Sequence, residues 1–115
     1  MACRKIHCKD CSERLGNPWN EVHEYLDGLF DWRTNLINHR VERHHAVGVE
    51  YCREQWGDEA AQAARIHIQR DFDILEVDDM PLDVIPKDKE DAIKWLDIWH
   101  KNMIPIEEFC REQND

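Results

Sequence analysis

The chain has 115 residues, a length that fits one domain with a core of its own. Its formal net charge is −10, from 25 acidic and 15 basic residues, and this balance argues against general binding to nucleic acid or to anionic membranes. The sequence contains no apolar run of membrane-spanning length, and it begins without the apolar run of a secretory signal. These features predict a single cytoplasmic domain over residues 1–115.

Helical periodicity dominates the chain, and only four glycines and four prolines interrupt it. Runs of β-branched residues are absent, which favours an all-α fold. Residues 1–16 form a polar, cysteine-rich start, and residues 74–86 form an acidic loop. The predicted helices span residues 18–28, 30–55, 58–73, 87–102 and 105–109. The sequence therefore predicts a compact bundle of four to five helices with a long central helix.

The predicted helix over residues 87–102 carries apolar side chains around a wide arc, with Trp95 and Trp99 one turn apart. Little of its surface is left for solvent, so we expect a second subunit to cover it in a homodimer. The acidic loop over residues 74–86 and the acidic C-terminal tail suggest another function. Such surfaces suit an interaction module that docks on a basic protein partner.

The most unusual segment is the basic stretch of residues 39–45, which holds three histidines and two arginines in an acidic chain. On a helical wheel, Arg33, Arg40 and His44 fall in the apolar sector of the predicted central helix, and His45 falls at its edge. A charge that enters a core must be paired or hydrogen-bonded. The partners are predicted to be acidic side chains of this chain or an anionic ligand.

Two His-x-x-x-Asp pairs, His23/Asp27 and His67/Asp71, each place both side chains on one face of a helix. This spacing suits two ligands of one metal ion, or a carboxylate that orients an imidazole. If the faces of the three helices converge, one pocket contains His23, Arg40, His44, His67 and Asp71.

Two functional interpretations and one structural interpretation of these groups stay open. The donor atoms of His23, His44, His67 and Asp71 are of the kind that binds a divalent metal, zinc above all. Arginine and histidine side chains could instead surround a small anionic ligand, because guanidinium binds phosphate and carboxylate through two hydrogen bonds. That second set comprises Arg40, Arg43, His44, His45, His67 and Asp71. In the structural interpretation, the same groups form a buried network that neutralises itself.

A second metal candidate lies at the N-terminus and comprises Cys3, His7, Cys8 and Cys11. The spacing of Cys8 and Cys11 is that of a zinc knuckle, which Cys3 and His7 would complete. The chain has five cysteines, an odd number, and no secretory signal precedes them. We therefore expect free thiols or a metal site rather than disulfides.

Several segments together resemble a family of short bacterial and phage proteins known only as a domain of unknown function. The family pattern His-Arg-x-x-Arg-His-His-x-x-Gly matches residues 39–48, and its His-Val/Ile-x-x-Asp step matches residues 67–71. Residues 22–27 are similar to an upstream motif, His7 matches a histidine near the family's start, and the similarity extends over about residues 5–100. The resemblance implies that the His/Arg cluster belongs to a family pattern, and it implies no particular activity.

Overall fold

The computed structural model describes residues 3–28, 40–101 and 106–114, so that Arg33 and the first residue of the basic stretch, His39, lie outside the described residues. The described helices are α1 (Arg4–Leu15), α2 (Asn20–Leu26), α3 (Arg40–Arg43), α4 (Ala46–Trp56), α5 (Asp58–Asp71), α6 (Lys89–Lys101) and α7 (Ile106–Asn114). Within these ranges there is no strand, and the prediction of an all-α fold is confirmed. None of the described helices combines the length and the apolar character that crossing a bilayer requires.

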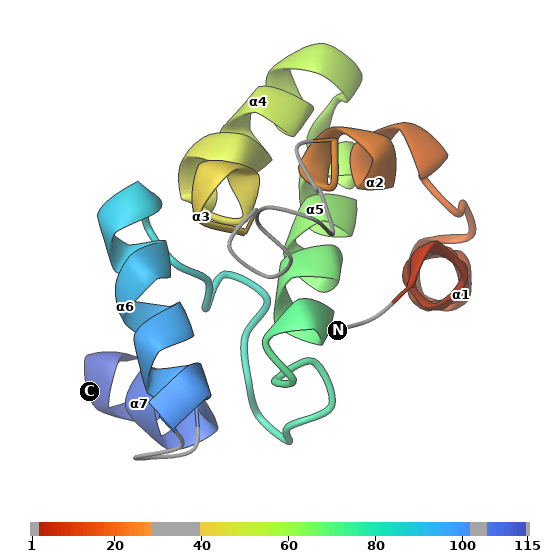
Figure 1. Ribbon diagram of the computed structural model, residues 1–115. Helices are drawn as coiled ribbons and strands as arrows, with labels where there is room; N and C mark the ends of the chain where they lie inside the picture. The colour runs from red at the N-terminus through yellow and green to blue at the C-terminus, as the bar shows by residue number, and fades with distance from the viewer. Residues whose placement is uncertain (1–2, 29–39, 102–105, 115) are drawn as a thin grey trace.

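Helix α5 organises the fold, because it packs against α1, α2 and α4 (Figure 1). Its first half buries small side chains that let the neighbouring helices approach closely, namely Ala60, Ala61, Ala63 and Ala64. Its second half buries Ile66 and Ile68 together with two polar residues, His67 and Asp71. One helix thus supplies both apolar packing and buried polar groups.

The polar N-terminal segment folds as helix α1, which the pattern of the sequence does not predict. The buried residues of this helix are His7, Asp10 and Cys11, so no apolar stripe marks it in the sequence. Asp10 accepts two hydrogen bonds from Arg70 of α5, at 2.8 Å from Nε and 2.9 Å from Nη2. This ion pair holds α1 against α5 and brings His7 into the core.

The long central helix predicted over residues 30–55 is wrong where the structure describes it, because α3 and α4 are separate helices. His44 and His45 lie in the break between them. The N–H group of Ala46 donates to the carbonyl of Pro86, at 2.8 Å, instead of continuing a helix from α3. The break turns the side chain of His44 into the core, where it is fully buried.

Gly48 allows the close contact between α4 and the end of α3. A Cβ atom at this position would lie 1.9 Å from the carbonyl oxygen of Arg43, so no side chain fits there. Replacing Gly48 with alanine is expected to displace the turn that carries His44 and to lower the free energy of unfolding by about 1–3 kcal/mol. Urea unfolding followed by tryptophan fluorescence would measure the change. An unchanged free energy of unfolding would contradict the expectation.

The chain between α5 and α6 contains no helix or strand. Its apolar side chains, Ile74, Val84 and Ile85, are buried, whereas the acidic side chains of Glu76, Asp78, Asp79 and Asp83 are exposed. Helix α6 follows and buries Trp95, whose ring meets the ring of Phe72 edge-on with centroids 5.2 Å apart. Ile93 of α6 is 50% exposed, and the homodimer expected from this helix stays a prediction.

Candidate metal centre

Four side chains from three parts of the chain converge beside α5. His67 and Asp71 lie one turn apart on α5, Asp27 follows the last residue of α2, and His44 lies between α3 and α4. Each side chain offers one nitrogen or oxygen atom as a potential ligand, and these four atoms all lie within 4.8 Å of one another. His44, His67 and Asp71 are buried, and the side chain of Asp27 is 26% exposed. We call these four residues the His/Asp cluster.

The donor atoms of the His/Asp cluster are spaced like ligands around one ion. His44 Nε2 lies 2.9 Å from Asp71 Oδ2 and 3.6 Å from Asp27 Oδ1. His67 Nε2 lies 3.2 Å and 3.4 Å from the same two oxygen atoms. Nitrogen and oxygen ligands at about 2.0–2.2 Å from a tetrahedral zinc ion stand about 3.3–3.6 Å apart. Four of the six separations between donor atoms therefore lie near this spacing, and all six are within 4.8 Å.

His67 directs a buried nitrogen atom towards the two carboxylates without forming a good hydrogen bond to either. Its Nε2 atom contacts Asp27 and Asp71 closely but is aligned for a hydrogen bond with no atom of the described residues. A buried polar atom without a hydrogen-bond partner calls for an explanation such as an ion or a water molecule. From this position between two carboxylates, His67 could provide a ligand atom to a metal ion.

Two more buried histidines, His7 and His23, pack around His67, and we call them the outer histidines. The ring of His7 stacks on that of His67 with centroids 3.5 Å apart, and its Nε2 atom lies 3.2 Å from Asp71 Oδ1. His23 lies 2.9 Å from His67, Nδ1 to Nδ1, and its Nε2 donates to the carbonyl of Pro18 at 2.7 Å. The outer histidines therefore support members of the cluster and do not belong to it.

The structure brings together three of the four residues predicted as metal ligands: His44, His67 and Asp71. The fourth, His23, lies behind His67, and its helical partner Asp27 takes the place in the cluster. The i,i+4 spacing places the members of each pair on one helix face, and the structure brings His67, Asp71 and Asp27 together with His44. The spacing cannot tell which member of a pair provides the ligand atom.

The predicted anion-binding residues beyond the cluster point elsewhere. Arg43 donates to the carbonyl oxygen of Tyr25 at 2.7 Å, and its guanidinium lies 4.3 Å from the centroid of the Tyr25 ring. His45 is buried and donates from Nε2 to the carbonyl oxygen of Glu42 at 3.0 Å. Arg40 begins α3, and its side chain lies outside the described part of the chain.

The N-terminal candidate does not form a common site in the structure. Cys3 precedes α1 and is exposed, whereas Cys11 is buried with its thiol 3.8 Å from the carbonyl oxygen of Ala63. His7 faces Asp71, and Cys8 donates to Asn20. Over residues 3–28, 40–101 and 106–114, the His/Asp cluster is the one group of three or more potential ligands that are close enough to share an ion.

The two carboxylates of the cluster attract positive charge to His67. Burial lowers the pKa of His67, but its contacts with Asp27 and Asp71 outweigh burial and raise the pKa to about 9. Burial raises the pKa of Asp71, but contacts with His44, His67 and His7 hold it well below its usual range. Burial lowers the pKa of His44 to about 4, despite its hydrogen bond to Asp71. At neutral pH, His67 therefore carries a proton whose charge offsets part of the charge of the two carboxylates.

The shifted pKa values of the buried histidines predict that their summed contribution to the stability of the metal-free protein is largest near pH 6.5. The pKa of His67 in the folded protein, about 9, exceeds the unfolded value of about 6.5, so its stabilising contribution is complete below pH 6.5 and is lost as the pH rises through 9. The folded-state pKa values of His44 and His23, about 4 and about 3, are lower than the unfolded value. The unfolded chain therefore binds more protons below pH 6.5, and stability falls there.

Urea unfolding in the presence of a chelator, measured between about pH 4 and about pH 10, tests this profile. We expect the free energy of unfolding to fall on both sides of the maximum, and replacement of His67 with glutamine should remove the alkaline fall. A free energy of unfolding that keeps rising towards alkaline pH would contradict the assigned charge on His67.

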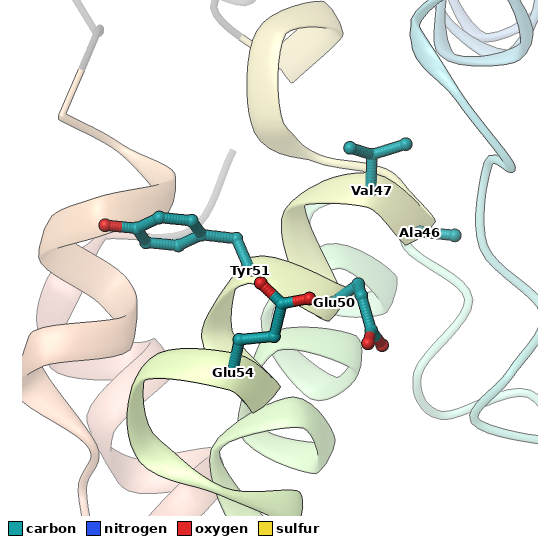
Figure 2. Close-up of a pocket in the computed structure, with 5 residues that line it drawn as sticks. All are labelled: Ala46, Val47, Glu50, Tyr51 and Glu54. Atoms are coloured by element: carbon teal, nitrogen blue, oxygen red, sulfur yellow. The ribbon is translucent and has the colours of Figure 1, made fainter.

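A shallow hollow on the exposed side of α4 is separate from the His/Asp cluster. It has a volume of about 440 Å³ and is lined by Ala46, Val47, Glu50, Tyr51 and Glu54 (Figure 2). No cluster residue contributes to its lining. The hollow therefore offers no access to the candidate metal centre.

Comparisons with known proteins give no match to a protein-family model, to a curated protein or to a solved structure. The family resemblance of residues 39–48 and 67–71 stays a prediction. The functional interpretation rests on the geometry of the cluster alone.

Proposed function

We propose that this protein binds one divalent metal ion, with zinc the best match, through Asp27, His44, His67 and Asp71. The convergence of two imidazoles and two carboxylates within 4.8 Å is the observation that carries the proposal. Imidazole and carboxylate are both established zinc ligands. The two carboxylate charges balance the charge of a divalent ion, so the loaded centre is neutral and suits burial.

The small anionic ligand expected from the sequence would be a fifth ligand of the ion, in addition to the four protein ligands. When bound, zinc supplies a Lewis acid that polarises an oxygen-bearing ligand. Asp27 is the partly exposed member of the cluster, so a ligand would enter from its side.

The adjacent histidines His44 and His45 provide a matched pair of variants to test the proposal. Both are buried, but only His44 belongs to the cluster, whereas His45 bonds to the backbone of Glu42. Loss of an outer-shell partner costs about 10- to 100-fold in metal affinity, so loss of a ligand should cost at least about 100-fold. Zinc titration against a chromophoric chelator should show that His44→Gln loses tight binding and that His45→Gln retains it.

The alternative function, an acidic module that docks on a basic protein, predicts a different result. In that case the buried network is structural, and the unmodified protein would not bind zinc in the same titration. Reversal of charge in the exposed acidic loop, for example Asp83→Lys, would then abolish binding to the partner, while His44→Gln would weaken only the fold. Equal zinc binding by His44→Gln and His45→Gln would also contradict the proposed centre.

A further inference from the structure

The hydrogen bonds of His23 fix where its ring carries a proton. A carbonyl oxygen can only accept, so the contact of 2.7 Å with Pro18 places a hydrogen atom on His23 Nε2. The other described polar contact of His23 is with the ring of His67, and neither contact provides an anion that would hold a positive charge on His23. His23 is therefore neutral, and its Nδ1 atom is an acceptor.

The tautomer of His67 follows from that of His23. The two Nδ1 atoms lie 2.9 Å apart, and because His23 Nδ1 accepts, His67 Nδ1 must carry the hydrogen atom that is shared between them. In neutral His67 the lone pair is then on Nε2. That atom is the one that lies 3.2–3.4 Å from the carboxylate oxygens of Asp71 and Asp27.

The turn before α2 holds the Pro18 carbonyl in place. Trp19 adopts a left-handed backbone conformation, with φ 54°, which is uncommon for a residue with a side chain. Its N–H group donates to Asn17 Oδ1 at 2.9 Å, and its indole Nε1 donates to Glu59 of α5 at 3.0 Å. The chain thus ties this strained turn to the helix that carries His67, and strain of this kind is often kept at functional sites.

We infer that His23 is the positioning residue of the metal centre, because it accepts the Nδ1 hydrogen of His67 and so presents Nε2 of His67 as the metal-binding nitrogen. The inference rests on the proposed zinc function. Metal-binding histidines commonly donate their second ring N–H to a carboxylate or a carbonyl. Here the acceptor is an imidazole: His67 Nδ1 donates to His23 Nδ1, and His23 Nε2 in turn donates to the carbonyl of Pro18.

Two variants of His23 separate positioning from packing. In His23→Phe the ring shape is kept, but the Nδ1 hydrogen of His67 loses its acceptor. In His23→Asn the side-chain oxygen lies at a position similar to that of the lost Nδ1 and can still accept. We expect zinc affinity, measured by chelator competition, to fall about 10- to 100-fold in the phenylalanine variant and to recover substantially in the asparagine variant.

A second measurement needs no variant and reads the tautomer directly. Nitrogen-15 NMR of the histidine side chains in the zinc-loaded protein should show His67 with hydrogen on Nδ1 and the metal on Nε2. Zinc binding by His23→Phe equal to that of the unmodified protein, or a hydrogen atom on His67 Nε2, would overturn the inference while leaving the metal centre in place. Absence of zinc binding by the unmodified protein would instead overturn the proposed function itself.

Discussion

Replacing Asp71 with asparagine is expected to abolish zinc binding and to destabilise the metal-free protein by about 3–5 kcal/mol. The carboxylate of Asp71 contacts three imidazoles, those of His7, His44 and His67, and its charge supports the proton on His67. An amide of the same size removes that charge and leaves a buried cation poorly compensated. Both losses come from one side chain, because Asp71 is at once a proposed ligand and the central acceptor of the network.

The matched control for this variant is Asp83→Asn, which makes the same chemical change at an exposed position of the acidic loop. Urea unfolding and zinc titration of both variants should show large effects for Asp71 alone. If Asp71→Asn bound zinc as tightly as the unmodified protein, Asp71 could not be a ligand. If it lost zinc but kept its full stability, the assigned charge network would be wrong.

The affinity for zinc is expected to rise about tenfold for each pH unit between pH 7 and pH 9, and to level off above. Zinc can bind His67 Nε2 only after the proton has left, and the pKa of His67 in the metal-free protein is about 9. His44, whose pKa is about 4, is neutral throughout this range and adds no slope. Each bound ion should therefore release close to one proton at neutral pH.

Chelator competition at a series of pH values measures this slope, after correction for the titration of the chelator and of the zinc ion. Calorimetry in two buffers of different ionisation enthalpy counts the released protons independently. An affinity that does not change between pH 7 and pH 9, with no proton release, would show that zinc does not replace the proton on His67.

The sequence predicts the parts of the fold that follow from apolar periodicity and from turn residues. Helix α5 is found close to its predicted range, and Gly57 marks its start with a positive φ of 100°. Helix α1 is missed because the side chains that it buries include His7 and Asp10, which look like surface residues in the sequence. The role of His7 beside Asp71 is missed for the same reason.

The break between α3 and α4 could not be predicted from periodicity, because the residues on both sides continue a helical pattern. It depends on two tertiary contacts, the hydrogen bond from Ala46 to Pro86 and the approach of Gly48 to the backbone of Arg43. The sequence nevertheless predicts His44 in the core with an acidic or anionic partner, and the structure pairs it with Asp71, because a charged group in a core must be paired or hydrogen-bonded. The choice between Asp27 and His23 as ligand depends on the end of α2, which spacing alone does not define.

X-ray absorption spectroscopy of the zinc-loaded protein would test the proposed centre most directly. We predict a shell of nitrogen and oxygen ligands at about 2.0–2.2 Å, with the outer-shell scattering of two imidazoles and no sulfur ligand. A sulfur shell at about 2.3 Å would place the ion on cysteine ligands, such as Cys3, Cys8 and Cys11, and would contradict the centre formed by Asp27, His44, His67 and Asp71.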